Sequence, residues 1–458
     1  MFSVRPILAA AALLVIPLAS ASAAFADAAT PALATPTPTP TPGSFRRALP
    51  APADSIFPAS DFLGPTIGVP VDQGNRFYGW FDPGIEVSTS QNSNYPLTYN
   101  DAPNIPQLDQ LIFRWERQPD TVQTKHFDWG YRFSNLFGVD YRWTTAQCYF
   151  CNQLLTYNRL YGDDPVEMYG ILYYPHIGQG TEIQLGRFIS PPDIEAQLAP
   201  NNFLYTHSVF FDFDAYTQTG ALFSTKLSDY WTLVYGVHSG NDMSPWSPSQ
   251  HFPTFELIGR WISHANKDSL YGGVDAINFT PYMRTYIGTA NSANPSTGVL
   301  YGHDNLQQFN LTWTHVFEPN FQNLVETYWL YEYNTYQGGT INNGPFKFGG
   351  GGGVGAFLPG RSTATGVVDY LEYKFAPKDF ASFRVDYMND QSGWRSGFPT
   401  SYGSLTFGIT DKMSSVVTIR PEIRYETAFR TGITPYDNGT KAAQTTFGMD
   451  AIIYFGNP

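Results

Sequence analysis

Residues 127–143 read FDWGYRFSNLFGVDYRW. Aromatic and aliphatic side chains hold almost every odd position, whereas charged or small side chains hold most even positions. An alternation with a period of two places the two sets on opposite faces of a β-strand. We therefore predict a long strand over residues 127–143 that has one apolar face and one polar face.

The same alternation recurs between about residue 75 and residue 455. It is clear at residues 111–116, 383–388 and 415–426, where apolar and charged side chains again take turns. The predicted strands reach the ~9–11 residues that a membrane-spanning strand needs, and aromatic residues cluster near their ends. Strands of soluble sandwiches usually run nearer ~5–6 residues. Strand length therefore favours a membrane barrel over a soluble sandwich.

The connections alternate between short turns and long loops, which predicts about sixteen strands. The predicted fold is all-β: a transmembrane antiparallel up-and-down β-barrel with short periplasmic turns and long extracellular loops. The short turns are expected near residues 118–125, 176–181, 228–230, 265–268, 318–320, 376–379 and 410–412, and the long loops near residues 91–107, 144–165, 190–206, 239–253, 281–304, 335–362, 390–401 and 428–441.

The composition agrees with such a fold. Of the 458 residues, 14% are charged, against about 25% in average soluble domains, and 16% are aromatic. The formal net charge of −13 argues against a nucleic-acid binder, which needs a basic surface for phosphates. The abundance of aromatic residues argues against a disordered chain. Few charges and many aromatics suit a surface that faces lipid.

The N-terminal part is expected to lie outside the barrel. Residues 1–26 combine a basic start, a short apolar run and small residues, which indicates a secretory signal peptide; a signal anchor is the alternative. Residues 27–74 contain a strict Thr-Pro alternation at residues 35–42, which favours an extended periplasmic spacer; a docking peptide is the alternative. The barrel is then expected over residues 75–458.

Several stretches of the chain resemble one known family. The last predicted strand, residues 445–455, has an apolar face and ends on an aromatic residue, like the C-terminal signal that outer-membrane assembly machinery reads; an ordinary edge strand is the alternative. The chain resembles the putative β-barrel porin type 2 family, and the resemblance implies an outer-membrane barrel without an established substrate. The matching pieces are LIFRWER (111–117), FDWGYR (127–132), LGRFISP (185–191), THS (206–208), YTQTGA (216–221), RPEIRY (420–425) and FGMDA (447–451).

The charged residues on the polar faces are the candidate functional residues. By parity they face the inside of the barrel, where opposed acidic and basic rows would select solutes by charge. The alternative is that they form ion pairs that stiffen the wall. The loop over residues 190–206 is the candidate for an inward-folded constriction. The predicted pore-lining set is Arg114, Glu116, Arg132, Asp140, Arg142, Glu256, Arg260, Lys374, Arg384, Asp386, Arg420, Glu422, Arg424 and Asp450.

Cys148 and Cys151 form a Cys-x-x-Cys pair in a predicted extracellular loop. A zinc site would need two further ligands, and thioredoxin-like chemistry would need a βαβ setting. A local disulfide is the favoured interpretation in an exported protein. The eight histidines show no metal-ligand spacing, and no Ser, His and acid set shares a face, so we expect no cofactor, no metal and no enzyme activity.

These observations predict a porin of the bacterial outer membrane through which small hydrophilic solutes or ions diffuse passively. The first alternative is a non-transporting barrel with a plugged lumen and a loop-based adhesion or structural role. The second is a selective sugar channel, which would need a ladder of inward aromatic residues. The expected partners are outer-membrane lipid, the assembly machinery and small solutes, with no nucleic acid. A homotrimer stays open.

Overall fold

The computed structural model describes residues 75–146, 149, 160–191, 193–214, 216–246, 252–279, 306–337 and 357–457. The predicted signal peptide, the Thr/Pro-rich segment and both cysteines lie outside these residues, so the disulfide stays a prediction. No helix in the described ranges is long and apolar enough to cross a membrane.

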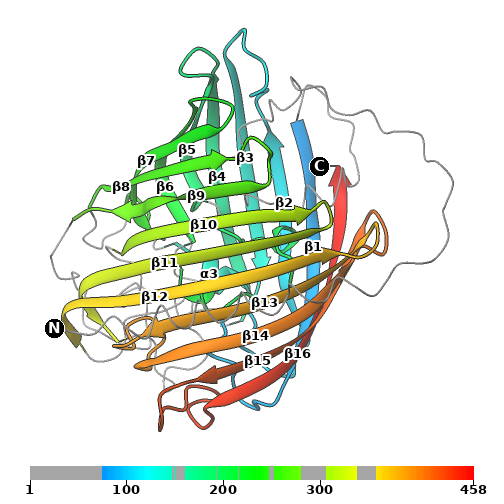
Figure 1. The fold of residues 1–458 in the computed structure, drawn as a ribbon, viewed down its shortest axis with the longest axis vertical. Coiled ribbons are helices and arrows are strands. Elements are labelled where there is room, and N and C mark those ends of the chain that lie inside the picture. The colour runs from blue at the N-terminus through cyan, green and yellow to red at the C-terminus, as the bar shows by residue number, and fades with distance from the viewer. Residues whose placement is uncertain are drawn as a thin grey trace. The chain divides into compact units, whose positions relative to one another are not determined.

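The described residues form one closed antiparallel barrel of sixteen strands, in which each strand pairs with its neighbours in the sequence and β16 pairs with β1 (Figure 1). The predicted fold class is therefore confirmed. The strands are β1 (Asn75–Ser88), β2 (Gln107–Arg117), β3 (Asp128–Gly138), β4 (Gly162–Tyr174), β5 (Thr181–Ile189), β6 (Thr217–Lys226), β7 (Trp231–Asn241), β8 (Thr254–Ile262), β9 (Asp268–Ile277), β10 (Gln307–Glu318), β11 (Phe321–Tyr336), β12 (Phe357–Lys374), β13 (Asp379–Asp390), β14 (Thr400–Asp411), β15 (Val417–Ala428) and β16 (Ala443–Asn457).

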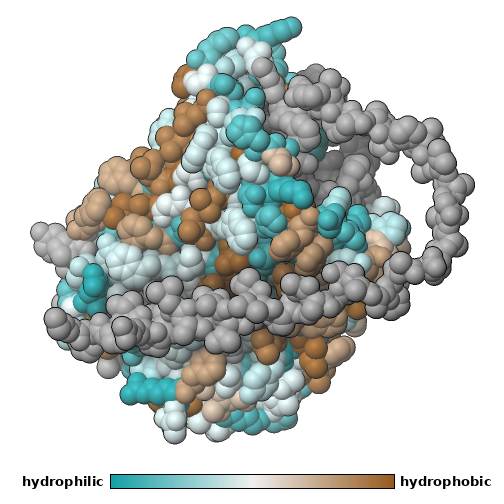
Figure 2. Space-filling view, viewed as in Figure 1, coloured by the Kyte–Doolittle hydropathy of each residue, from teal (hydrophilic) through white to brown (hydrophobic). Residues whose placement is uncertain are grey.

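The period-two pattern sorts side chains between the outside and the lumen. On β2, Trp115 is 53% exposed, whereas its neighbours Arg114 and Glu116 are 7% and 3% exposed. Apolar side chains lie across the flank of the barrel, and hydrophilic ones gather at the hairpin tip at the top of the view (Figure 2). The apolar faces of the strands therefore form the outer surface, as a barrel in lipid requires.

The two ends of the barrel differ in the length of their connections. The seven short connections all lie at one end, which we name the turn end, and the long connections lie at the other, the loop end. Each predicted short turn overlaps an observed one, although the turn predicted at residues 410–412 lies over residues 412–416, because β14 extends to Asp411. Both the N-terminus of β1 and the C-terminus of β16 lie at the turn end, since β1 and β16 are antiparallel neighbours.

The predicted strand over residues 127–143 is too long. β3 ends at Gly138, and residues Tyr141–Thr144 form a short helix, α3. Gly138 has φ +157°, and a Cβ there would lie 2.0 Å from the carbonyl oxygen of Asp109 on β2. A glycine is needed at this close approach, and the chain leaves the sheet directly after it.

Among the described residues, two of the long connections contribute long buried stretches to the lumen. One is the stretch over residues 93–101, all buried. The other, which we name the inner segment, spans residues 190–216 and includes two short 3-10 helices, Ala199–Asn201 (η2) and Phe211–Phe213 (η3). Its apolar side chains, such as Phe203, Leu204 and Phe210, pack with buried residues of the β11–β14 wall. The inward folding predicted for residues 190–206 is thus observed and extends further along the chain.

Candidate functional site

A closed ion-pair network lines the wall formed by β2, β3 and β4. Glu167 of β4 accepts from Arg114 at 2.6 Å and from Arg132 at 3.2 Å. Arg132 also donates to Glu116 at 2.8 Å. Ser134 supplies a further hydrogen bond to Glu167 at 2.7 Å. Each of these buried charges therefore has an opposite charge within contact, which offsets the cost of removing it from water.

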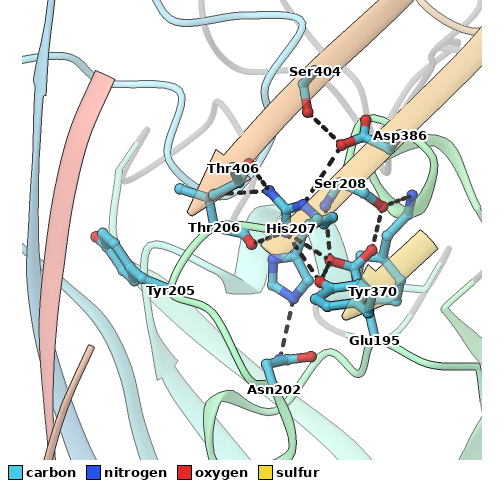
Figure 3. A network of polar contacts seen from close by, with 12 residues as sticks. Glu195, Asn202, Tyr205, Thr206, His207, Ser208, Tyr370, Asp386, Ser404 and Thr406 are labelled. Atoms are coloured by element: carbon cyan, nitrogen blue, oxygen red, sulfur yellow. Dashed lines mark hydrogen bonds and ion pairs between the residues drawn. The ribbon is translucent and has the colours of Figure 1, made fainter. Parts of the chain in front are cut away.

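The opposite part of the wall uses its charges to hold the inner segment. Arg384 of β13 forms an ion pair with Glu195 of the inner segment at 3.0 Å and donates to the carbonyl oxygen of Thr206 at 2.5 Å. Its other guanidinium nitrogen donates to the hydroxyl of Thr406 at 3.0 Å. Figure 3 shows these groups converging between the strands and the inner segment. Arg384 is itself completely buried.

Residues of β15 also hold the inner segment. The Glu422 carboxylate accepts from the backbone N–H groups of Tyr205 and Thr206, at 2.8 and 3.1 Å, and from the Thr206 hydroxyl. Arg424 donates to the carbonyl oxygen of His207 and forms an ion pair with Glu426 at 2.6 Å. A backbone that lacks secondary structure thus finds its hydrogen-bond partners on the barrel wall, as a buried chain must.

Three more predicted residues complete this attachment. Arg420 pairs with Asp450 of β16 and donates to the carbonyl oxygens of Ala199, at 2.8 Å, and Asn202, at 3.1 Å. Asp386 of β13 accepts from the backbone N–H of Val209 at 3.0 Å. Six of the predicted pore-lining residues thus surround the inner segment instead of facing open solvent.

Asp140 and Arg142 do not lie on a strand, so the prediction that parity places them on a strand face is wrong. Asp140 precedes α3, and Arg142 lies within it. Arg142 forms a buried ion pair at 2.7 Å with Asp101, which belongs to the inward stretch over residues 93–101. Burial raises the pKa of Asp140 to about 8, against a lowering contribution from the Gln110 amide that donates to it at 2.8 Å.

Glu256, Arg260 and Lys374 lie where parity predicts, on the inward side of β8 and β12. Glu256 is buried, whereas Arg260 and Lys374 are half-buried. Lys374 lies at the turn end, with its ammonium 5.4 Å from the centre of the Phe380 ring.

The single histidine of the inner segment is held neutral. His207 is buried, its ring is stacked on Phe211 at 4.5 Å, and its Nε2 lies 2.9 Å from the carbonyl oxygen of Ala196. Burial, reinforced by the nearby Arg384, Arg420 and Arg424 charges, lowers its pKa to about 3. His207 therefore adds no positive charge to the lumen at neutral pH.

Several buried acidic residues of the lumen are absent from the predicted pore-lining set. Glu326 of β11 accepts from the backbone N–H of Ile194 at 2.8 Å, and the alternation of β11 could have revealed it. Glu195 and Asp193 lie in the inner segment, where no periodicity exists to predict their direction. Burial and the neighbouring carboxylates of Glu326 and Asp214 raise the pKa of Asp193.

Two cavities lie beside the inner segment. One cavity, with about 330 Å³ of empty space, lies near the turn end and is lined in part by Phe203, Lys412 and Tyr454. A second, with about 250 Å³, lies between the inner segment and β1–β3 and is lined in part by Asp82 and His207. In the described ranges no group of three His, Cys, Asp or Glu side chains is arranged to hold a metal ion.

Comparison with known proteins identifies both a family and a fold. A family model described as putative beta-barrel porin-2, OmpL-like, matches residues 75–455. The chain is similar to an anion-selective porin from Comamonas acidovorans, with 8% identity, coverage of 83% of this chain and 99% of that chain, and a TM-score of 0.51. It is also similar to OmpF of Salmonella typhi in complex with daunomycin, with 10% identity, coverage of 83% and 97%, and a TM-score of 0.50. At such low identities, the similarity of this chain to each of the two porins shows a common fold only. No curated protein matches the chain.

Proposed function

We infer the function from one premise: this chain belongs to the putative beta-barrel porin-2, OmpL-like family, and it is a protein of the bacterial outer membrane. The family and the fold are those of porin-type channels. We propose that small hydrophilic solutes or ions diffuse passively through the lumen, and that the inner segment sets the narrowest part of the path. The proposal includes no catalytic step.

The distribution of charge across the wall supports this proposal most strongly. Strand positions that face outward carry large apolar side chains, whereas inward positions carry most of the charged ones. Burying so many charged groups inside a barrel has a cost that a purely structural interior would avoid with apolar residues. A lumen that passes hydrophilic solutes gives these groups a use, because they replace water around the solute and select it by charge.

A swelling assay with proteoliposomes tests passive diffusion. The full-length protein is reconstituted, and the vesicles are shifted into isotonic solutions of uncharged sugars of increasing size. We expect rapid swelling with pentoses and progressively slower swelling with disaccharides and trisaccharides, because the inner segment narrows the path. Protein-free vesicles and heat-denatured protein are the controls. Swelling no faster than in protein-free vesicles for every solute would contradict the proposal.

A specific observation favours a second candidate, a plugged barrel with a structural role. The inner segment and residues 93–101 are buried along almost their whole length. A plug that never moves would give no swelling in the wild type but swelling once the inner segment is removed. The same assay on a variant without the segment therefore separates the two candidates.

A further inference from the structure

Two carboxylates on neighbouring strands face the lumen away from the arginines that hold the inner segment. Glu256 of β8 is 3% exposed and Asp275 of β9 is 1% exposed. In the described part of the chain, both carboxylate oxygens of Glu256 and both of Asp275 lack a hydrogen-bond partner. Gln218 of β6 is the polar side chain that interacts with Asp275, and its amide donates to Asn241 at 3.1 Å. Two like charges so placed repel one another unless a cation lies between them.

The backbone around these carboxylates departs from regular pairing. In the registers of β9 with both β8 and β10, the pairing shifts at Asp275, which is left without a register partner on either side. A bulge of this kind re-aims side chains and is common beside functional sites. On β7, a Cβ at Gly236 would lie 2.5 Å from Oε1 of Glu256, so the absence of a side chain there makes room for the carboxylate.

A tyrosine hydroxyl beside the two carboxylates is also without a partner. Tyr271, on β9, is 3% exposed, and its hydroxyl has no hydrogen-bond partner in the described part of the chain. Its strongest charged neighbours are Glu256 and then Asp275. A buried tyrosine hydroxyl usually finds a hydrogen-bond partner. A buried hydroxyl without a partner that interacts electrostatically with two such carboxylates therefore points to a ligand that binds oxygen atoms.

We propose that Glu256, Asp275 and Tyr271 form a transit site for a small inorganic cation such as K⁺ in the lumen. Carboxylate and hydroxyl oxygens are the ligands that hard cations prefer. With two carboxylates instead of three or more, the site binds weakly, and a channel needs weak binding so that the ion can leave. The inference rests on the proposed channel function and adds a preference for cations to it.

The carboxylates around the site favour a cation, whereas Arg260 opposes one. Two further carboxylates lie where the inner segment meets β10 and β11. Asp193 of the segment accepts from Asn310 of β10, and Glu326 of β11 accepts from the backbone N–H of Ile194. Arg260, four residues after Glu256 on β8, is the basic residue nearest in sequence and lies opposite Tyr271 in register. By contrast, Arg384, Arg420 and Arg424 are each engaged by carboxylates and carbonyl oxygens, which leaves them less able to attract anions.

The reversal potential of reconstituted protein in a KCl gradient tests the site. We expect the wild type to prefer K⁺ over Cl⁻, and we expect Glu256→Gln to lower the permeability ratio by about threefold, with a further fall in Glu256→Gln/Asp275→Asn. Glu372→Gln is the matched control. It removes one buried carboxylate from β12, where Ser382 donates to that group at 2.6 Å. Its ratio should stay close to that of the wild type.

The outcomes separate the site from the channel. An unchanged ratio in Glu256→Gln, or an equal fall in Glu372→Gln, would overturn the cation site while leaving the channel intact. Absence of any current in the wild type would instead overturn the proposed function. Tyr271→Phe removes only the hydroxyl and should fold normally. A measurable fall in its K⁺ permeability supports the site even where the carboxylate variants fail to insert, and an unchanged value contradicts it.

Discussion

Arg384 is the residue that ties the inner segment most firmly to the wall. Its guanidinium contacts Glu195, Thr206 and Thr406 while being fully buried. In Arg384→Ala the Glu195 carboxylate would remain buried beside no cation, and breaking a buried pair in this way costs about 3–5 kcal/mol. We therefore expect a drop of this size in the free energy of unfolding, measured by urea titration of the protein in lipid vesicles.

Arg430→Ala is the control for this prediction. Arg430 is exposed and donates to the carbonyl oxygen of Pro399 at 2.9 Å. A change at such a surface position usually stays within about 0.5 kcal/mol. Equal losses in the two variants would mean that the contacts of Arg384 with the inner segment do not stabilise the barrel.

Parity could predict where Arg384 and Glu422 point, but not what they contact. Each lies on an alternating stretch, so its inward direction follows from the sequence. Their partners lie in a loop without periodicity, 178 residues before Arg384 and 216 residues before Glu422. A local sequence pattern does not predict a contact between residues so far apart in the chain. Glu195, in the same loop, left no signal for the same reason.

At the scale of elements, the alternation predicted strands well and failed where the backbone departs from regular pairing. β3 stops at Gly138 because the glycine lies against the β2 backbone, although the alternation of residue types continues to residue 143. Asp275 has the inward parity of Tyr271, but the pairing of β9 shifts beside it, so its neighbour Ala276 is buried as well. In both places the deciding event is a backbone contact with a neighbouring strand, which the sequence of one strand does not encode.

Asp437 joins two connections at the loop end and should make their contact sensitive to acid. Its carboxylate accepts from the backbone N–H groups of Gln91 and Asn92, at 2.9 and 2.7 Å, and pairs with Lys441 at 3.0 Å. Burial disfavours its charged form, but these contacts outweigh burial and lower its pKa to about 2. The contribution is therefore full above an unfolded-state pKa of about 4 and is lost as the pH falls toward 2.

Hydrogen exchange of the Gln91 and Asn92 amides measures this contact. Protection, corrected for the intrinsic exchange rate, should fall between about pH 4 and pH 2 by an amount on the order of 1 kcal/mol, after allowance for screening by solvent. Asp437→Asn lacks the charge, so its protection should already be reduced at pH 6 and show no step in this range. An acid step of the same size in both proteins would assign the change to other groups.

At the scale of the whole molecule, the number of strands and the sides of their connections were predictable, whereas the filling of the lumen was not. Seven short and eight long connections join sixteen strands. Because each connection reverses the chain direction, the short and the long ones lie at opposite ends of the barrel. Closure brings β1 beside β16, which are more than 350 residues apart in the chain. Once the barrel is closed, the two inward connections compete for one interior, and only three-dimensional packing decides how they share it.

Single-channel conductance in planar bilayers measures whether the lumen is a path for hydrophilic solutes that the inner segment narrows. Wild-type protein is compared with a variant in which a short Gly-Ser linker replaces residues 194–213. We predict discrete conductance steps for the wild type and larger steps for the variant. Steps in the variant with none above background in the wild type would contradict the claim and establish a closed plug.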